Sequence, residues 1–377
     1  MSGGRLRVEI IVEQLRREVP GGIGTYCRGL VAGLSALEPT ARPEVCLFAS
    51  RPPHGADDPL DRFGLPVRSS RLPGPLMTRL WDRRVPVGFL DGRRTGAVLH
   101  ATSFAFPPRS GRRSAVMVHD LAWRRFPEAY PPRGRAWHEQ VLRRVASAAT
   151  GFVVPSEATA EDLLGAGLGI EERRVRVIEE GVDHLEPPDE AGADALLAGL
   201  SLGPGDGFLL TVGTLEPRKN LARLVEAYEL ARRRLPEPWP LLVVGPPGWG
   251  GTASSPVLAR PGVVPVGRLE GGVLTALYGR ARCVAYVPLV EGFGLPAVEA
   301  MAAGAPVVAT AGLPSPKGAA LEADPLEPAA IAEALVTASL DGEAREQLRR
   351  HGRSRAAELS WSDCAAAHVG LWAELAG

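Results

Sequence analysis

Lysine and asparagine are almost absent from this sequence of 377 residues. Its 43 basic residues include only two lysines, Lys219 and Lys317, and Asn220 is its only asparagine. We attribute this scarcity to genome composition, a bias that has no physical meaning for the fold. The same bias makes the adjacent pair Lys219 and Asn220 informative, because two rare residue types stand together there.

Three further absences exclude whole classes of protein. No run of about 18 apolar residues occurs, so the sequence predicts no transmembrane helix. The N-terminal stretch MSGGRLRVEIIVEQL carries charges inside its apolar run, which does not fit a secretory signal. The four cysteines lie far apart without CxxC spacing, which indicates buried thiols rather than disulfides or a zinc site. We therefore expect a cytoplasmic protein without a bound metal.

The formal net charge is zero, but it is unevenly distributed. Residues 1–185 carry 27 basic against 21 acidic residues, whereas residues 186–377 carry 16 against 22. The excess of positive charge lies in residues 51–113, with 12 arginines against 5 acids. A zero total argues against a nucleic-acid-binding protein coated in positive charge, although a local basic patch remains open.

Apolar runs alternate with helical patterns along the whole chain. In the first half we expect strands at Leu6–Val12, Glu44–Phe48, Val98–Ala101, Ala115–His119, Gly151–Pro155 and Val175–Ile178. Helices are expected at Gly24–Leu37, at about Arg133–Ala149 and from Ser156 onward. Continuous apolar strands separated by helices are typical of a parallel sheet covered on both faces.

The second half repeats this pattern. Strands are expected at Phe208–Val212, Leu241–Gly245, Val263–Val266, Cys283–Val287 and Val307–Ala309. Helices are expected at Leu221–Leu235, Leu274–Ala281, Pro296–Ala303 and Glu327–Ser339. Residues 184–206 are rich in Pro, Gly and acidic residues, and we expect the linker between two domains at the start of this stretch. The sequence thus predicts an α/β protein of two doubly wound Rossmann-like domains, with ligands at the carboxyl ends of the strands in a cleft between them.

The motif EPRKN, residues 216–220, follows the strand FLLTV and precedes a helix. Arg218 and Lys219 therefore lie at the carboxyl end of a strand and at the N-terminus of a helix, where unpaired N–H groups and the helix dipole favour anions. Two cations at such a place predict a diphosphate site. The alternative is a solvated surface pair, with Asn220 capping the helix.

A second motif, EGFGLPAVEAMAAGAPVVAT, follows the strand CVAYVPLV. Glu291 lies in a loop with Gly292 and Gly294, where the backbone can approach a ligand closely. Glu299 is expected on the first turn of the next helix, and a carboxylate there suits the two hydroxyls of a ribose. The alternative is a loop with two exposed glutamates, which leaves the paired glycines unexplained.

Together, GTLEPRKN and EGFGLPAVEAMAAGAPVVAT resemble the donor-binding domain of GT-B retaining glycosyltransferases, specifically the large family 4, or group 1 transferases. VGPPGWG resembles the family's glycine–tryptophan loop, VVPSEATAEDL and RVRVIEEGVD resemble the end of its acceptor domain, and nearly the whole chain is covered. The resemblance implies domains at 1–184 for the acceptor and 185–357 for the donor. It also implies a C-terminal helix, 358–377, that crosses back onto the first domain.

The resemblance assigns a role to each motif. It implies that Arg218 and Lys219 bind the donor diphosphate, that Glu291 holds the sugar and that Glu299 binds the ribose. The other implied donor contacts are the loop residues Gly245, Gly292, Phe293, Gly294 and Leu295, and backbone near Arg268 and Leu269 for the base.

In the first domain, VPGGIGTYCRGL is a weak nucleotide fingerprint, because Cys27 stands where its last glycine would be. The resemblance implies that Gly22 and Gly24 approach the donor phosphates. The strand AVMVHD places His119 at a carboxyl end, where the family's matching motif implies a catalytic or sugar-contacting role. A lone histidine is otherwise more often structural.

Two positions depart from the family pattern. Thr214, in the donor loop after Gly213, stands where many relatives carry an arginine, and Ser315 stands where relatives usually carry an acid. The first departure leaves one cation fewer for the phosphates.

The expected function is retaining transfer of a hexose from a nucleotide-diphosphate sugar to a sugar or lipid-linked acceptor, without a cofactor. UDP, GDP, ADP and TDP stay open as donor nucleotides. One alternative is a nucleotide-sugar 2-epimerase of the same fold, which needs extra cleft carboxylates that the sequence does not offer in context. The other is a non-catalytic binder of sugar nucleotides.

The basic segment 71–94 mixes six arginines with Leu76, Met77, Leu80, Trp81 and Phe89. Such a mixture can dock on an anionic membrane. The alternative is a segment that packs its apolar residues inward, because Pro73, Pro75 and Pro86 interrupt any long amphipathic helix.

Overall fold

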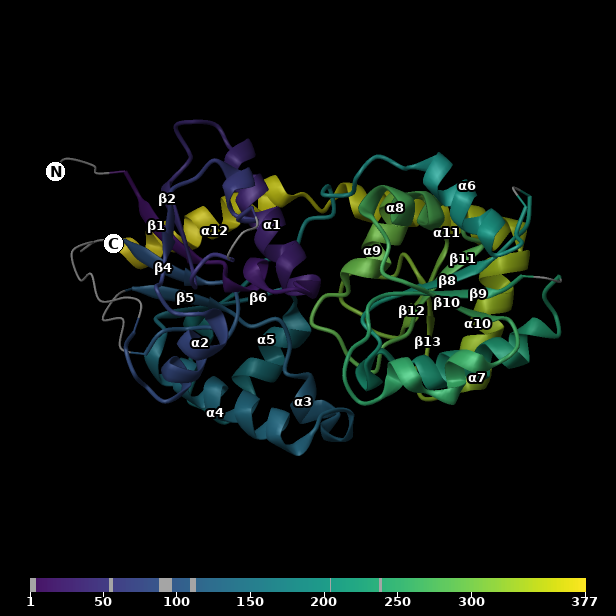
Figure 1. Ribbon diagram of the computed structural model, residues 1–377, viewed down its shortest axis with the longest axis horizontal. Coiled ribbons are helices and arrows are strands. Elements are labelled where there is room, and N and C mark those ends of the chain that lie inside the picture. The colour runs from purple at the N-terminus through teal and green to yellow at the C-terminus, as the bar shows by residue number, and fades with distance from the viewer. Residues whose placement is uncertain (1–4, 54–56, 88–96, 109–112, 204, 237–238) are drawn as a thin grey trace. The chain divides into compact units, whose positions relative to one another are not determined.

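The computed structural model describes residues 5–53, 57–87, 97–108, 113–203, 205–236 and 239–377. The chain divides into two compact units (Figure 1). The first contains Met1–Leu121, Arg133–Gly181 and Ser360–Gly377, and the second contains Ala122–Pro132 and Val182–Leu359. The predicted boundaries were 184–185 and 357–358. The grouping of Ala122–Pro132 with the second unit was not predicted.

The first unit contains a parallel sheet that has, within the described ranges, seven strands in the order β3-β2-β1-β4-β5-β6-β7. The strands are β1 (Arg7–Ile11), β2 (Glu44–Ala49), β3 (Val67–Ser69), β4 (Val98–Ala101), β5 (Ser114–Met117), β6 (Gly151–Val154) and β7 (Val175–Val177). The associated helices are α1 (Gly21–Ala36), α2 (Gly74–Asp82), α4 (Pro132–Ala148), α5 (Glu157–Leu164) and α12 (Trp361–Ala376).

The second unit repeats this plan with six described strands in the order β10-β9-β8-β11-β12-β13, again all parallel. The strands are β8 (Leu209–Val212), β9 (Leu241–Val244), β10 (Val263–Gly267), β11 (Cys283–Tyr286), β12 (Val307–Thr310) and β13 (Leu321–Ala323). The helices are α3 (Ala122–Arg125), α6 (Glu190–Gly199), α7 (Leu221–Arg232), α8 (Gly271–Arg280), α9 (Leu295–Ala302), α10 (Pro328–Leu340) and α11 (Gly342–Ala357).

Apart from the edge strand β13, the described strands of the second sheet present apolar side chains to both faces. Leu210 and Tyr286 pack with α6, α8 and α9, whereas their neighbours Leu209 and Ala285 pack with α7 and α10 on the opposite face. Both faces are therefore covered, as the continuous apolar runs predicted. The α/β class with two Rossmann-like domains is confirmed, because both sheets have the strand order of dinucleotide-binding folds.

The C-terminal helix α12 packs on α1 in the first unit, and Figure 1 shows this yellow helix among the purple and blue elements of that unit. Trp361 is buried over two glycines of α1. A Cβ atom on Gly29 would lie 2.0 Å from the indole of Trp361, and one on Gly33 would lie 2.0 Å from its carbonyl oxygen. The glycines thus allow close helix contact between residues far apart in sequence.

Several elements differ from the prediction. The edge strands β3 and β13 were not predicted, and neither were α2, α3, α6 and α11. Helix α6 lies inside the stretch 184–206 that contained the predicted linker. Helix α1 begins at Gly21 rather than at Gly24, so Gly22 and Gly24 lie in its first turn and not in a preceding loop.

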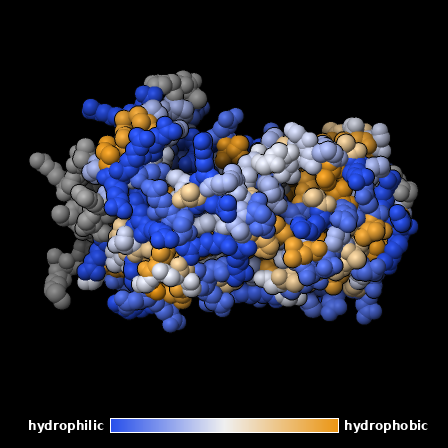
Figure 2. Space-filling model, turned by 90° about the horizontal axis from the view of Figure 1, so that it is seen from below, coloured by the Kyte–Doolittle hydropathy of each residue, from blue (hydrophilic) through white to orange (hydrophobic). Residues whose placement is uncertain are grey.

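The basic segment is described up to residue 87, so Phe89, Arg93 and Arg94 lie outside the described residues. Met77 and Trp81, both in α2, are buried, and the ring of Trp81 stacks on that of Phe48 with 6.2 Å between the ring centroids. Leu76 is exposed, but so are Trp137, Leu230 and Leu340 on other helices. On the face drawn in Figure 2, hydrophobic residues likewise lie in several separate groups among hydrophilic ones. The inward packing of α2 favours the non-membrane interpretation, and membrane docking stays a prediction.

Candidate functional site

The predicted site residues of the second unit follow neighbouring strands at one edge of the sheet. Strand β8 pairs with β9 on one side and with β11 on the other, although β11 follows it only after two intervening strands. This is the point at which the strand order reverses, and open α/β sheets bind ligands beyond the carboxyl ends of the strands at such points. Lys219 follows β8, Gly245 follows β9, and Glu291 follows β11.

Asn220 fixes the turn between this edge and α7. Its φ of 61° is left-handed, a conformation that asparagine tolerates better than most residues. Its amide nitrogen donates to the carbonyls of Val287 at 3.0 Å and Pro325 at 2.7 Å, and only 3% of the residue is exposed. The side chain does not cap the helix, so the capping interpretation was wrong. Asn220 ties the cation-bearing turn to the loops after β11 and β13.

Arg218 and Lys219 converge on one carboxylate. Nη1 of Arg218 lies 2.7 Å from Oε1 of Glu291, and the amine of Lys219 donates to the same oxygen and to the hydroxyl of Tyr286 at 2.9 Å. Arg218 also pairs with the buried Glu216 at 2.7 Å. The Arg218 and Lys219 side chains are only 13% and 18% exposed, so the interpretation as a solvated surface pair was also wrong.

The two cations control the charge of Glu291. Burial alone would raise the pKa of this carboxyl group, but Arg218 and Lys219 lower it to about 2. Burial raises the pKa of Glu216 despite the opposing effect of Arg218. Glu291 is therefore ionised around neutral pH, and the cluster holds its opposite charges in direct contact.

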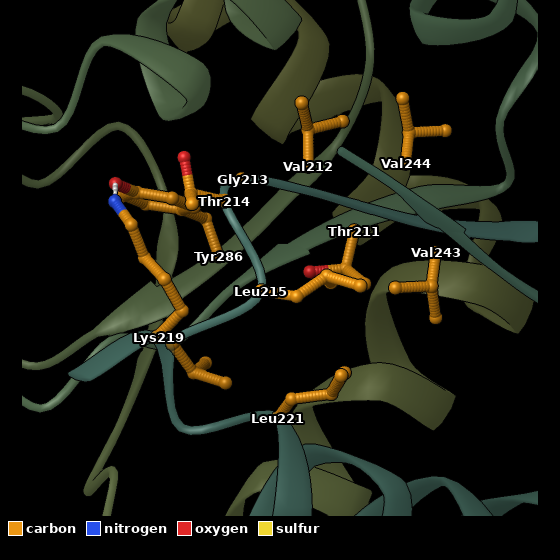
Figure 3. Close-up of a pocket in the computed structure, with 11 residues that line it drawn as sticks. Thr211, Val212, Gly213, Thr214, Leu215, Lys219, Leu221, Val243, Val244 and Tyr286 are labelled. Carbon is orange, nitrogen blue, oxygen red and sulfur yellow. Dashed lines mark hydrogen bonds between the residues drawn. The ribbon is translucent and has the colours of Figure 1, made fainter. Parts of the chain in front are cut away.

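Backbone atoms approach closely beside this cluster. A Cβ atom on Gly245 would lie 1.9 Å from the carbonyl oxygen of Gly213, so only glycine fits after β9. Figure 3 shows Lys219 reaching the hydroxyl of Tyr286, with Gly213 and Thr214 beside them, above a pocket lined by aliphatic side chains of β8 and β9. The structure thus brings Thr214, Lys219 and Gly245, three of the expected donor-site residues, together beside Gly213.

The glycine-rich loop after β11 leads directly into α9. Gly294 precedes the helix with a φ of 103°, which a side chain would strain. Ser315 is fully buried, and its hydroxyl donates to the carbonyl of Gly294 at 3.0 Å. Gly292, Phe293 and Leu295 are buried as well. The serine at this departure from the family pattern therefore anchors the predicted sugar-binding loop.

Glu299 lies in the second turn of α9, not in the first, because the helix begins at Leu295. Its two carboxylate oxygens have separate partners: Oε1 lies 3.0 Å from Nε2 of His184, and Oε2 accepts from the hydroxyl of Tyr278 at 3.1 Å. Neither partner was predicted, because Tyr278 has the pattern of a core helix residue and His184 lies in the linker stretch. The predicted base contacts, Arg268 and Leu269, lie between β10 and α8, with Arg268 exposed.

In the first unit, His119 follows β5. Nε2 donates to the carbonyl of Thr102 at 2.9 Å, and Nδ1 lies 3.5 Å from the buried carboxylate of Glu180. Burial alone would lower the pKa of His119, but Glu180 and the Thr102 carbonyl raise it above its usual value. Both nitrogens face acceptors, which suits a fixed, charged imidazole better than a general base. Its role as a catalytic or sugar-contacting residue stays a prediction.

The N-terminus of α1 holds the two predicted phosphate-contacting glycines. A Cβ atom on Gly22 would meet nothing within 4 Å, whereas one on Gly24 would lie 2.3 Å from Pro20. Gly24 therefore serves the close turn into the helix, and Gly22 leaves open space at the helix end. One turn further along α1, the ring of Tyr26 packs edge-on against His119 at 5.1 Å.

No group of three His, Cys, Asp or Glu side chains in the described part of the chain is placed to hold a metal ion. No helix of the described ranges is long and apolar enough to cross a membrane.

The chain matches two protein-family models. The model described as "Glycosyltransferase Family 4" matches residues 20–185, and the model described as "Glycosyl transferases group 1" matches residues 198–355. The first match contains His119, and the second contains the cluster of Glu216, Arg218, Lys219 and Glu291. The two matches together cover most of the chain.

Curated relatives agree with these matches. "O-antigen chain mannosyltransferase B" of Escherichia coli is 28% identical over 280 residues, which are 71% of this chain and 71% of the relative. "D-inositol 3-phosphate glycosyltransferase" of Xylanimonas cellulosilytica is 29% identical over 262 residues, 64% of this chain and 60% of that protein.

Solved structures resemble the whole chain. HepE of Anabaena, solved in complex with UDP and glucose, has a TM-score of 0.72 at 17% identity and covers 98% of this chain and 100% of its own. Sucrose-phosphate synthase of Thermosynechococcus elongatus has a TM-score of 0.73 at 21% identity, covering 98% and 99%. At these identities the likeness shows the fold alone.

Proposed function

This chain belongs to the group 1 glycosyltransferases, and on that premise we propose that it moves a hexose from a nucleotide-diphosphate sugar to an acceptor hydroxyl with retention of configuration. The observation that carries the proposal is the convergence of Arg218 and Lys219 beside Glu291 at the carboxyl edge of the second sheet. Such a cluster offers two cations for a diphosphate and one carboxylate for sugar hydroxyls.

In the proposed reaction, the bond between the anomeric carbon and the diphosphate oxygen breaks through an oxocarbenium-like transition state. The leaving diphosphate gains negative charge, which Arg218, Lys219 and the N-terminus of α7 stabilise. The acceptor oxygen forms the new bond on the same face, and its proton passes to the departing phosphate oxygen. No protein nucleophile is required, and we propose that no metal is needed because the two cations balance the charge.

The other roles follow from position in the second unit. Glu299 would accept hydrogen bonds from the ribose hydroxyls, and the backbone near Arg268 and Leu269 would contact the base. Gly213, Thr214 and Gly245 would line the phosphate side. The mannosyltransferase among the relatives, and the glucose bound with UDP in HepE, suggest mannose and glucose donors as the first to try. The acceptor, a sugar or a lipid-linked glycan, would bind in the first unit near His119.

Incubation of the enzyme with UDP-, GDP-, ADP- and TDP-sugars of mannose and glucose, with and without candidate acceptors, tests the proposal. Transfer or slow hydrolysis that persists in EDTA, with an anomer of retained configuration by NMR, would support it. Epimerised donor would instead indicate a 2-epimerase. Tight binding without turnover would indicate a sugar-nucleotide binder.

A further inference from the structure

The cations predicted to bind the diphosphate are already occupied. Oε1 of Glu291 is 2.7 Å from Nη1 of Arg218 and also accepts from Lys219, while Nη2 of Arg218 is 2.7 Å from Glu216. Two carboxylates thus face two cations, and the cluster offers little net charge to an incoming anion. A diphosphate can reach Arg218 and Lys219 fully only if one carboxylate leaves.

The two carboxylates differ in their freedom to leave. The Glu216 side chain is 3% exposed and lies on the same turn as Arg218, so it stays with that residue. Glu291 is 11% exposed and belongs to the loop between β11 and α9, next to Gly292. Backbone atoms hold its loop to the cation turn: the amide of Leu289 donates to the carbonyl of Arg218 at 2.9 Å, and Arg218 donates to the carbonyl of Val290 at 3.3 Å. The Glu291 carboxylate itself meets the cations only through side-chain contacts, so it can turn away while the loop stays in place. Glu291 is therefore the carboxylate that a ligand would displace.

We propose that Glu291 is an internal competitor of the diphosphate, which makes strong binding at this site conditional on the presence of a sugar. The inference rests on the proposed function. The hexose of a nucleotide sugar offers hydroxyl donors to the displaced carboxylate, so Glu291 exchanges its cation partners for new hydrogen bonds. A diphosphate without a sugar offers no such partners, and its binding carries the full cost of breaking the ion pairs.

Glu291 would therefore act as a specificity-determining residue. It lowers the affinity for nucleoside diphosphates relative to nucleotide sugars, and it returns to Arg218 and Lys219 once the hexose has been transferred. The returning carboxylate promotes release of the nucleoside diphosphate product. The same residue would thus contact the sugar in one half of the cycle and expel the product in the other.

Inorganic pyrophosphate is the direct probe, because it lacks both sugar and base. We expect Glu291→Gln to bind pyrophosphate at least about tenfold more tightly than the wild type in isothermal titration, since a neutral amide competes poorly for the cations. Glu299→Gln is the matched control: it removes the charge of the other motif glutamate, whose partners are His184 and Tyr278, and should leave pyrophosphate affinity unchanged.

Equal or weaker binding of pyrophosphate by Glu291→Gln would overturn the inference. If that variant fails to fold, Glu291→Asp gives the same test, because its shorter side chain pairs less closely with the cations. If the wild type transfers sugar but Glu291→Gln binds pyrophosphate no more tightly than the wild type, the proposed function stands and the role of Glu291 as a competitor is wrong. A gain in affinity without any donor turnover would leave the competitor standing without the transferase.

Discussion

The hydroxyl of Tyr278 donates to Oε2 of Glu299 over 3.1 Å, so a fully buried tyrosine of α8 holds the carboxylate of α9 that is proposed to bind a ribose. Burial and the neighbouring Glu299 raise the pKa of Tyr278 well above its usual value, and the hydroxyl therefore stays a donor over the working pH range. With His184 on the other oxygen, the orientation of Glu299 is set before a nucleotide arrives.

Tyr278→Phe should weaken nucleotide binding with little effect on turnover. The phenyl ring fills the same space, but Glu299 loses one of its two positioning contacts, which is present in ground and transition states alike. We expect KM for the donor to rise by roughly three- to tenfold with kcat nearly unchanged. Glu299→Gln should act in the same direction, whereas Glu291→Gln should lower kcat. The reverse split would show that the two glutamates exchange roles.

Lys219→Ala should reduce transfer by about a hundredfold or more, because a charge-assisted contact to the leaving group is worth on the order of 3 kcal/mol. The Lys219 side chain is largely buried, so its loss leaves the Glu291 carboxylate with one partner fewer. Glu291 still pairs with Arg218, and we therefore expect the variant to fold. Steady-state kinetics and thermal melting measure both effects. Lys317→Ala, which removes the other and exposed lysine, is the matched control. Wild-type turnover in Lys219→Ala would exclude a diphosphate contact.

Asn220 can be separated into a backbone and a side-chain contribution. Asn220→Gly keeps the left-handed backbone but removes the two hydrogen bonds to Val287 and Pro325, and should cost about 2 kcal/mol of unfolding free energy. Asn220→Ala adds backbone strain of about 1 kcal/mol. Denaturant titration compares the two. A glycine variant as stable as the wild type would mean that the amide contributes nothing.

His368 should make the protein acid-sensitive. It is fully buried in α12, hydrogen-bonded to Tyr26 at 2.8 Å, and burial lowers its pKa to about 4. The unfolded state takes up a proton near pH 6.5 and the folded state only near pH 4, so stability falls as the pH drops through this window, by on the order of 3 kcal/mol. His368→Gln should flatten the decline measured by denaturation at several pH values. His351→Gln, at an exposed histidine, should not.

Gly29→Ala should destabilise the first unit by about 2–4 kcal/mol, because the added methyl group would overlap the indole of Trp361. Gly370→Ala on α12 is the opposite case. No atom lies within 4 Å of its Cβ position, and replacing a helical glycine should raise stability by up to about 1 kcal/mol. Equal effects of the two substitutions on the thermal midpoint would contradict the packing of α12 on α1.

The apolar runs were sufficient to predict the two parallel sheets, since β6, β9, β11 and β12 are apolar throughout or nearly so. Strands β3 and β13 were missed because their three residues, VRS and LEA, include a charged one and are followed by polar residues. Strand β7, VRV, is as short and also carries a charge, but Ile178 continues its apolar pattern. Helix α11 was missed because its sequence, GEAREQLRRHGRSRAA, is dominated by arginine and buries little. Short edge strands and polar helices owe their structure to tertiary packing, which no local pattern reveals.

For the site, strand ends predicted which residues matter but not which of them meet. Arg218 and Lys219 could be placed after β8, and Glu291 after β11, from sequence alone. Their mutual ion pairs depend on β11 lying next to β8, which follows from the sheet order and not from the chain order. Tyr278 and His184 were missed for the same reason. Each is unremarkable in its own segment and becomes a partner of Glu299 only through the packing of α8 and the linker on α9.

The close fit of Trp361 over Gly29 has a consequence for biosynthesis. Helix α1 leaves the ribosome early, but the helix that covers it is translated only after every residue of the second unit. Until α12 has been synthesised, the apolar surface of α1 that it covers in the folded protein therefore stays exposed. We expect this exposed surface to favour aggregation during that interval, so slowing elongation within the second unit should increase aggregation of the first.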